Sequence, residues 1–592
     1  MKRRRYVFVC VAVLLAAAGQ TAMASTLDRT LDPVILKGAD LIDCFTGSSP
    51  DDIVAFRYQG DSWEQIPVQA DEMATLDIVT PYGPYAAAAG YPPPTGVNVL
   101  FYIDVDTYTG ADPDTSFDDN DELVFMAKDS GGEPTSFTYP EGVISGSACK
   151  IIITDPLDGG TGYVYLFEQD GTLDPDASTS YVDYQFHLIA GTYPDDYSIA
   201  GGFNPEETTI TTSNYSHHFS DLWINDGLEI YAGLATGTDI LDRHQNYFAP
   251  GNCARTEDTF SQGEGCFVTN KSGPIRVIRS YMGANSGPLT QRTNVFYEGR
   301  QDIVTDLRVH EINGVYDVFD YEPAATGMVY YSNLNTTGLQ LDGVPETANT
   351  GLLEWEFVTG MQGSLVLLHD LESDLLIGTE ADIDSYWEDD SSNPVSDCTG
   401  DGLAYGTSGV ALLFVPSDNI CTDPLGPGCN NLRYVKAKRH IYYDEPGITT
   451  ADAAQYWNRL QEPLTIVVEP VDDTCTDNDG DGYYPQTGCA TPLDCNDANE
   501  NIYPTNLNTY CDCEGPYPEG TTEVCSGDAD EDCDGLVDNE DPECQGYSSA
   551  ANAEASAYGS ESLTGSGAFN GLALLLIPVG AVFFLRILRR KR

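Results

Sequence analysis

The runs CKIIITDP, residues 149–156, and GYVYLFEQ, residues 162–169, decide the fold class of this chain. Each run is short, rich in β-branched and aromatic side chains, and flanked by turn-forming residues. Such runs are typical of β-strands, because branched and aromatic side chains fit a pleated surface. Similar runs recur along the chain, including NVLFYIDV, IRVIRSYM, GMVYYSNL, SLVLLHDL and VALLFVP. The sequence therefore predicts a mainly β ectodomain of sandwich type.

The β-rich region is too long for one ordinary sandwich of about 100 residues. We expect either two β-domains or one large two-sheet sandwich. The turn-rich segment 200–209 is the predicted boundary, which gives domains over 25–205 and 206–470. One helical pattern stands out, TTADAAQYWNRLQ, where Thr449 or Thr450 can cap a short helix before the strand LTIVVEP.

Both ends of the chain predict export and membrane attachment. Residues 1–24 have a basic start, an apolar run and the cleavage pattern AMA, as in a signal peptide. Ala568–Leu585 is an uncharged apolar run, and the basic cluster RILRRKR follows it. About 20 apolar residues cross a bilayer as a helix, and a positive cluster stays on the cytoplasmic side. We predict a transmembrane helix over 568–588, a cytoplasmic tail over 589–592 and an exported ectodomain.

The C-terminal layout leaves two kinds of anchor open. Small residues, one apolar helix and a terminal basic cluster together resemble bacterial C-terminal sorting signals, which a surface-processing protease recognises. A plain single-pass anchor has the same features. Before the helix, residues 545–567 are small, polar and aperiodic, which predicts a flexible linker between the ectodomain and the membrane.

The charge of the chain excludes whole classes of partner. The chain has 27 Lys and Arg against 93 Asp and Glu. Four basic residues fall in the signal and five in the tail, so 18 remain against 93 acids, a net charge of about −75. A field of that sign repels nucleic acid and anionic lipid and favours metal cations or cationic polymers. The 41% apolar content still suffices for a large core.

The Cys/Asp-rich segment 471–544 contains the clearest candidate site. One loop in it has carboxylates at positions 1, 3, 5, 9 and 12, a glycine at position 6 and a backbone carbonyl at position 7. This is the oxygen-ligand order of a calcium loop, in which the glycine permits the sharp turn. The candidate ligands are Asp530, Asp532, Asp534, Leu536, Asp538 and Asp541.

A second acidic loop, DNDGDGYY, has the same beginning but lacks the closing acid, because position 12 is Gly488. Closure must then come from the later run LDCNDANENIYP. The candidate ligands of this second loop are Asp477, Asp479, Asp481 and Tyr483, with Asp494, Asn496, Asp497 and Asn499 for closure.

These acidic blocks also carry a family resemblance. DNDGDGYY, DCNDANENIYP and EVCSGDADEDCDGLVDNEDPEC, with interleaved cysteines, resemble the MopE-like metal-binding repeat of bacterial surface proteins and are similar to thrombospondin type 3 calcium repeats. The resemblance covers about residues 472–544 and implies a metal-binding surface module. Since this segment holds no His, its hard carboxylate ligands favour Ca²⁺ over copper.

The cysteine count predicts disulfides. The mature chain has fifteen cysteines, seven from Cys44 to Cys429 and eight from Cys475 to Cys544. In an exported protein that density implies disulfides. The eight can pair among themselves, whereas one of the seven must be free, buried or paired across domains. We predict a bridge between Cys253 and Cys266, which bracket a short polar loop.

Three further features leave alternatives open. The loop DVDTYTGADPDTSFDDNDELVF is either a solvated acidic loop or a calcium site. The segment FYEGRQDIVTDLRVHEI, with Tyr297, Arg300 and His310, is either a pair of strands with cross-strand ion pairs or the Tyr/Arg/His set of a polysaccharide lyase. His217 and His218 would point to opposite faces of a strand and could not share one ion. The other histidines are interpreted as satisfied polar contacts.

These observations predict an exported protein that is anchored at the cell surface and acts in adhesion or ligand display. Its partners would be the membrane, through the C-terminal helix, and a cell-surface polysaccharide or protein ligand. No nucleophile elbow, zinc-protease helix, phosphate loop or dinucleotide fingerprint occurs in the sequence. The alternative is a secreted polysaccharide-acting enzyme carried on the sandwich.

Overall fold

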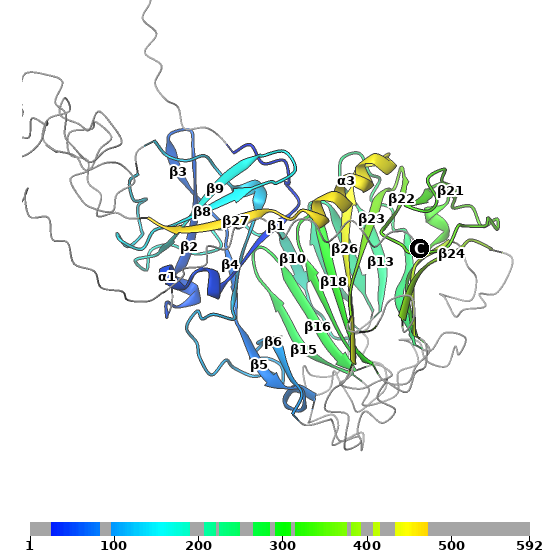
Figure 1. Ribbon diagram of the computed structural model, residues 1–592, viewed down its shortest axis with the longest axis horizontal. Helices are drawn as coiled ribbons and strands as arrows, with labels where there is room; N and C mark the ends of the chain where they lie inside the picture. The colour runs from blue at the N-terminus through cyan, green and yellow to red at the C-terminus, as the bar shows by residue number, and fades with distance from the viewer. Residues whose placement is uncertain are drawn as a thin grey trace, which may run out of the picture. The chain divides into compact units, whose positions relative to one another are not determined.

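The chain divides into two compact units, Met1–Val471 and Asp472–Arg592. The part of the chain that the computed structural model describes lies in the first unit. It is mainly β, built from antiparallel sheets in a sandwich arrangement, as the sequence predicts (Figure 1). The described residues are 25–471 without 46, 83–95, 136, 190–205, 221–223, 249–264, 284–289, 310–313, 374, 376–380, 392–405 and 415–432.

Two sheets form a large sandwich. The eight-stranded sheet has the order β10-β11-β12-β13-β14-β19-β25-β24, and the nine-stranded sheet has the order β15-β16-β17-β18-β26-β23-β22-β20-β21. The first comprises β10 (Val182–Gln185), β11 (Thr208–Thr212), β12 (Tyr215–Phe219), β13 (Asn225–Ile230), β14 (Leu241–Phe248), β19 (Gly314–Tyr321), β24 (Ala381–Glu388) and β25 (Thr407–Phe414). The second comprises β15 (Gly265–Ser272), β16 (Val277–Gly283), β17 (Thr290–Phe296), β18 (Arg300–Val309), β20 (Val329–Ser332), β21 (Leu339–Gln340), β22 (Trp355–Gly360), β23 (Gly363–Ser373) and β26 (Arg433–Asp444).

One hydrophobic cluster joins these two sheets. Leu228 and Phe319 of the eight-stranded sheet pack in it with Leu367 and Ile441 of the nine-stranded sheet. All four side chains are fully buried. Burial of apolar area on this scale is the main stabilising term of a sandwich, at about 25 cal/mol per Å². The inward-facing strand positions therefore hold the sheets face to face.

A small sandwich is formed by a five-stranded sheet, β27-β8-β9-β2-β3, and a three-stranded sheet, β1-β7-β4. Ile151 and Val164 of the larger sheet pack against Leu36 and Phe125 of the smaller one. The strands are β1 (Pro33–Lys37), β2 (Ile53–Gln59), β3 (Ser62–Ile66), β4 (Gln69–Asp71), β7 (Glu122–Met126), β8 (Cys149–Thr154), β9 (Thr161–Glu168) and β27 (Thr465–Pro470).

The outer face of the nine-stranded sheet is covered by several elements. The ribbon of β5 (Met73–Asp77) and β6 (Asn98–Tyr102) packs beside β15, where Phe101 meets Val268. Helix α3 (Thr450–Gln461) covers another part of the sheet, where Ala453 lies in one cluster with Trp355 and Leu368. The other helical elements whose bounds lie within the described residues are short: α1 (Ile42–Phe45), η1 (Gly38–Asp40), η2 (Pro50–Asp52), η3 (Ala127–Asp129) and η6 (Pro323–Ala325).

The predicted helix and the strand after it are confirmed. Thr449 precedes α3 and forms a capping box with Asp452, in which the Thr449 backbone N–H donates to the Asp452 carboxylate at 2.8 Å. Such a box satisfies backbone donors that have no partner inside the helix. The chain then enters β27, which pairs with β8 from Thr465 to Pro470. The last described strand thus completes the sheet of the small sandwich.

Strands on the two sides of residue 205 belong to one sheet. β10 pairs with β11 through Tyr184 and Ile210, so the large sandwich already begins at Val182. At the other end of the described chain, β27 returns to pair with β8. The small sandwich therefore contains strands from both ends of the described chain (Figure 1). The described residues therefore form two sandwiches whose strands are not separated at one point in the sequence.

Arg29 ties the N-terminal segment to the end of α3. Its guanidinium makes a bidentate pair with Asp155, at 2.8 and 2.7 Å, and also donates to the carbonyls of Arg459 and Glu462. Arg29 is 2% exposed. Bidentate pairing to a carboxylate fixes the geometry as well as the charge. This contact joins the first described segment, the β8–β9 turn and the start of the path into β27.

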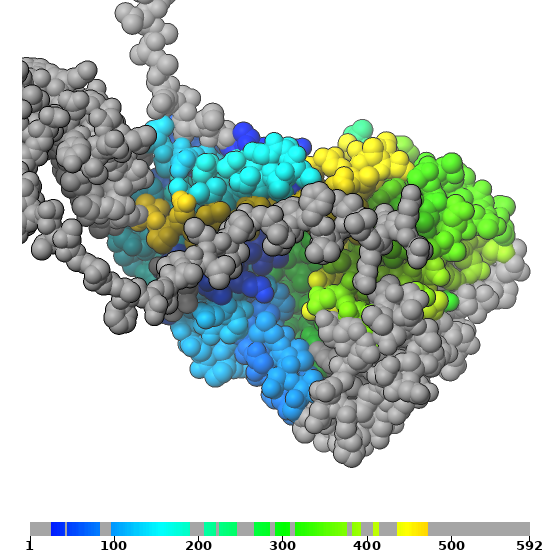
Figure 2. Space-filling view, viewed as in Figure 1, coloured from blue at the N-terminus to red at the C-terminus, as the bar shows by residue number. Residues whose placement is uncertain are grey.

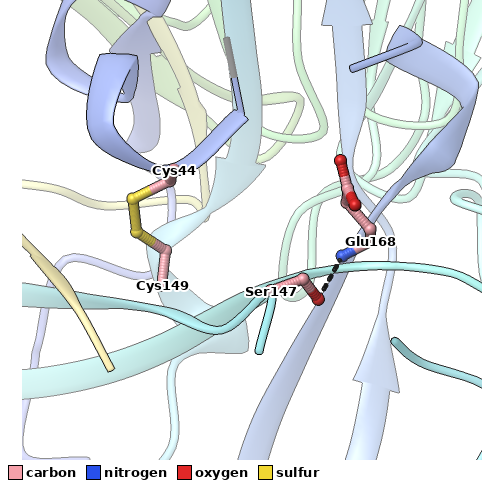
Figure 3. Close-up of a disulfide and its surroundings, with 4 residues drawn as sticks. All are labelled: Cys44, Ser147, Cys149 and Glu168. Atoms are coloured by element: carbon pink, nitrogen blue, oxygen red, sulfur yellow. Dashed lines mark hydrogen bonds between the residues drawn. A yellow bond between two sulfur atoms is a disulfide. The ribbon is translucent and has the colours of Figure 1, made fainter. Parts of the chain in front are cut away.

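A disulfide links Cys44, in α1, to Cys149, the first residue of β8 (Figure 3). Beside it, the backbone N–H of Glu168 donates to the Ser147 hydroxyl at 3.0 Å. Cys266 is a free thiol, so the bridge predicted between Cys253 and Cys266 is wrong. The side chain of Cys266 packs in an apolar cluster with Met282, and burial raises the pKa of its thiol. A free, buried thiol is one of the outcomes that the odd number of upstream cysteines left open.

No helix within the described part of the chain is long and apolar enough to cross a membrane. The predicted signal peptide 1–24, the module 471–544 from Asp472 onward, the linker 545–567, the transmembrane helix 568–588 and the tail 589–592 lie outside the described residues. The predictions for these segments stay predictions.

Candidate functional site

The calcium ligands predicted from spacing belong to the second unit and lie outside the described residues. This holds for both loops, Asp477 to Asp497 and Asp530 to Asp541. Candidate chemistry within the described residues therefore comes from other groups: an acidic loop, the Tyr297 segment and a buried ion cluster.

The acidic loop between β6 and β7 is held mainly by its own backbone. Carboxylate oxygens accept hydrogen bonds from N–H groups two or three residues away, as Asp112 does from Asp114 at 2.9 Å and Asp121 from Asp118 at 2.9 Å. Asp104 also reaches across to the N–H of Asn270, at 2.7 Å. Such local bonds are typical of Asx turns. Most acids of this loop therefore act as turn formers.

Three carboxylates nevertheless converge at one point. One oxygen each from Glu72, Asp112 and Asp121 lies within 4.8 Å of the other two. Glu72 comes from the junction between β4 and β5, and its Oε2 is buried and accepts no hydrogen bond. Burial, then the charges of Asp121 and Asp112, raise the pKa of Glu72 to about 7. Hard oxygen ligands suit Ca²⁺, which needs six to eight of them. The triad offers three.

The Tyr297 segment forms an ion-pair network, which agrees with the structural alternative. Arg300 on β18 donates to Asp302 at 2.8 Å and to Asp32 at 3.1 Å. His440, opposite Asp302 on β26, contacts the same carboxylate at 2.7 Å. Burial alone would raise the pKa of Asp302, but Arg300 and His440 hold it well below its usual range. His310 and Glu311 lie outside the described residues.

His217 and His218 point to opposite faces of β12, as expected. His217 is buried, contacts Asn225 and Tyr443 at 2.6 Å each, and burial lowers its pKa to about 4. His218 is half-exposed and contacts Asp226, whose hydrogen bond raises the histidine pKa. The two rings have different partners and do not share a site.

A buried ion cluster between the two large sheets was not predicted from the sequence. Asp317 on β19 accepts two hydrogen bonds from Arg292 on β17, at 2.9 Å each, and one from Arg439 on β26. His244 on β14 stacks on Phe319 with ring centroids 4.1 Å apart. The two arginines hold the pKa of Asp317 well below its usual range, although burial alone would raise it.

Within the part of the chain that the structure describes, the cavity beside this cluster is too small for a substrate. A cavity of about 10 Å³ adjoins Asp317, Arg439 and His369, which is space for about one water molecule. His369 is itself paired with the buried Glu356, at 3.1 Å. The arginines and histidines here are buried in the core. They come from strands that are far apart in the sequence but adjacent in space. Asp317, a charged residue in the mainly apolar run GVYDVFDY, is a sequence signal for such a cluster, but a weak one.

Comparisons with known proteins leave the family open. No family model matches the chain, and no curated protein matches it. Among solved structures, the chain is similar to an alpha-mannosidase from Enterococcus faecalis V583, with a TM-score of 0.30 and 8% identity. That similarity covers 76% of this chain and 44% of the mannosidase chain. Since the likeness is so distant, no activity is inferred from it.

Proposed function

We propose that this chain is an exported, membrane-anchored or surface-sorted protein that displays a β-sandwich body and carries a calcium-binding module. The oxygen-ligand order from Asp530 to Asp541 carries the proposal. In small modules of this kind the free energy of metal binding is also free energy of folding. Calcium outside the cell would then stiffen the segment that connects the body to its anchor.

The described residues fit this role in two ways. The last strand, β27, is paired along its length with β8, and Cys149 at the end of that ladder is disulfide-bonded to Cys44. The chain therefore leaves the body next to a covalent cross-link. Among the described residues, Arg300 and His440 both contact Asp302, and Arg292 pairs with Asp317. These structural contacts favour adhesion or ligand display over the lyase alternative.

Calorimetric calcium titration of the full-length chain tests the metal assignment. We expect dissociation constants of about 10⁻⁴ to 10⁻³ M, as for extracellular calcium modules. Asp534→Ala should remove one site, because it deletes a central ligand, and should leave the loop at Asp477 intact. Asp112→Asn is the matched control, since it reports whether the triad beside Glu72 takes up an ion of its own. Identical uptake by wild type and Asp534→Ala would contradict the calcium-loop assignment.

Protease treatment of intact spheroplasts tests the topology. A positive cluster at Arg586 to Arg592 should keep the tail inside, so added protease should remove the ectodomain from the cell surface. An antibody against the tail would detect the remaining anchor unless a sorting protease has removed it. Full protection of the ectodomain would contradict export.

A further inference from the structure

A cavity of about 220 Å³ lies between helix α3 and the turn that follows β26. Asp444 and Glu445 line it from the strand end, and Gln455, Tyr456 and Arg459 line it from the helix. Drug-sized ligands occupy pockets of about 300 to 1,000 Å³, so this cavity suits a smaller ligand. Helix α3 lies at the surface of the molecule, in yellow in Figure 2.

Tyr456 is held in a fixed orientation at this cavity. Its ring stacks on that of Tyr442, with centroids 4.3 Å apart, and its hydroxyl donates to Asp444 at 2.7 Å. Ligand sites commonly combine a fixed aromatic surface with a few placed polar groups, which set the orientation of the ligand. The Gln455 amide is exposed beside it and offers both a donor and an acceptor.

The charges at the cavity are unbalanced. Three carboxylates, those of Asp444, Glu445 and Asp452, line it together with one guanidinium. That guanidinium, of Arg459, already donates to the carbonyl of Asp28 at 2.9 Å and lies 3.6 Å from the Asp28 carboxylate. The cavity therefore has an excess of negative charge, in a chain whose net charge is −66. A cationic ligand is favoured there and an anionic one is repelled.

Glu445 is the carboxylate that remains for a ligand. Asp444 accepts from Tyr456, and Asp452 accepts from the capping residue Thr449. Among the described residues, no side chain donates a hydrogen bond to the Glu445 carboxylate. This side chain lies over the bare backbone of Gly233, where an added Cβ would come within 2.6 Å of its Cβ and 2.8 Å of its Oε2. Gly233 also has φ +58°, so both its backbone conformation and the lack of space for a Cβ favour glycine.

We propose that this cavity binds one sugar unit that carries a free amine, as in a polymer of unacetylated amino-hexose. The ammonium group would pair with Glu445, the ring would lie beside Tyr456 and hydroxyl groups would bond to Gln455. The excess negative charge rejects uronates at the same place. This assignment rests on the proposed display function and names the class of surface polymer that the body would hold.

Three trisaccharides of one length test the charge requirement on the full-length chain: glucosamine, N-acetylglucosamine and galacturonate trimers. Calorimetric titration at physiological salt should rank the glucosamine trimer first, the acetylated trimer at least fivefold weaker and the galacturonate trimer without detectable binding. Equal affinity for the first two, or binding of the galacturonate trimer, would overturn the proposal.

Variants separate this cavity from general attraction to an acidic protein. Glu445→Gln should weaken the glucosamine trimer by about fivefold, which is the scale of one solvent-exposed ion pair. Glu141→Gln removes one charge from an exposed acid in the small sandwich and should leave the affinity unchanged. Gly233→Ala should act like Glu445→Gln, because it displaces the same carboxylate. Equal effects of Glu445→Gln and Glu141→Gln would show nonspecific attraction and refute the site.

Calcium titration of the same samples separates the two proposals. If the calcium titration shows no uptake, and the glucosamine trimer still binds in EDTA, the calcium module is refuted and the sugar site stands. If calcium binds as expected and the glucosamine trimer does not bind, the sugar site alone is refuted.

Discussion

The small sandwich has an apolar core that a disulfide closes, whereas the large sandwich buries charged groups between its sheets. In the first, Leu36, Phe125 and Ile151 pack together, and Cys44 and Cys149 join α1 to β8. In the second, Asp317 lies between Arg292 and Arg439. A small domain buries a smaller fraction of its surface and gains more from a covalent link. A larger apolar core can offset the free-energy cost of desolvating an ion cluster. The cluster itself is sensitive to the loss of one partner, because the remaining charge stays buried.

Removing the disulfide should give the largest loss of stability, measured as unfolding free energy. The double replacement Cys44→Ser with Cys149→Ser opens a link between residues 105 positions apart. Loops of about 100 residues correspond to about 4.7 kcal/mol in the chain-entropy account. We expect the small sandwich to unfold at much lower urea concentration, as followed by hydrogen exchange of β8 and β9. Cys266→Ala, which removes a thiol without a bridge, is the control. A double variant as stable as wild type would remove the basis of the comparison.

Breaking the buried ion cluster should give the second-largest loss of stability. Asp317→Ala leaves Arg292 and Arg439 buried without this carboxylate, at a cost of about 3 to 5 kcal/mol in unfolding free energy. Asp306→Ala is the matched control, since its carboxylate lies 3.7 Å from Lys436 in a partly exposed pair worth about 0 to 1 kcal/mol. Urea denaturation measures both variants. Equal losses would mean that the buried position of Asp317 has no special weight.

Mild acid should weaken the large sandwich more than the small one. Burial lowers the pKa of His217 to about 4, and burial with the Arg439 charge lowers that of His244 to about 3. The unfolded chain, with histidine near 6.5, binds more protons below that pH, so stability falls from pH 6.5 toward 4. Glu72 acts in the opposite direction, because its raised pKa of about 7 favours the folded state as pH falls toward 4.5.

Denaturation midpoints at pH 6.5 and 4.5 measure this effect. His218→Gln sharpens the test, because the hydrogen bond that His218 donates to the Asp226 carboxylate raises the pKa of His218, and the resulting stabilisation is present at low pH. Without that group, the loss on acidification should become steeper. A large sandwich equally stable at both pH values would contradict the buried neutral state of His217 and His244.

The smallest expected effect concerns the cap of α3. Thr449→Ala removes the side chain of the capping box and should cost about 1 kcal/mol. Because α3 leads into β27, increased protease cleavage near Gln461 is the local readout. Thr450→Ala, one residue into the helix, is the control and should change little. If both variants are cleaved at the wild-type rate, the cap does not secure the connection between the two sandwiches.

Local sequence was informative wherever the signal was contained in one segment. The runs at 149–156 and 162–169 form β8 and β9, and the helix beginning after Thr449 has the expected cap. Alternation along β12 placed His217 and His218 on opposite faces. In each case the preference of the backbone and the side-chain period decide the outcome without distant partners.

Groups that come together only in the folded chain could not be predicted from local sequence. Asp112 and Asp121 belong to an acidic loop that the sequence marks, but Glu72 joins them from another junction. The disulfide partner of Cys44 is 105 residues away, and the loop between Cys253 and Cys266 gave a wrong pairing because Cys266 faces the core. Proximity in sequence says little about which side of a strand a thiol occupies.

The sequence by itself determined the β class, the capped helix, the strong negative charge and the calcium-type spacing of the second unit, because each is a property of composition or of neighbours along the chain. Only the tertiary structure decided that β27 completes the five-stranded sheet of the small sandwich, that Asp317 lies between two arginines, and that Glu445 lines a cavity and packs over Gly233. These contacts depend on which strands pair across hundreds of residues. Sheet register and burial set that pairing, and no local pattern encodes it.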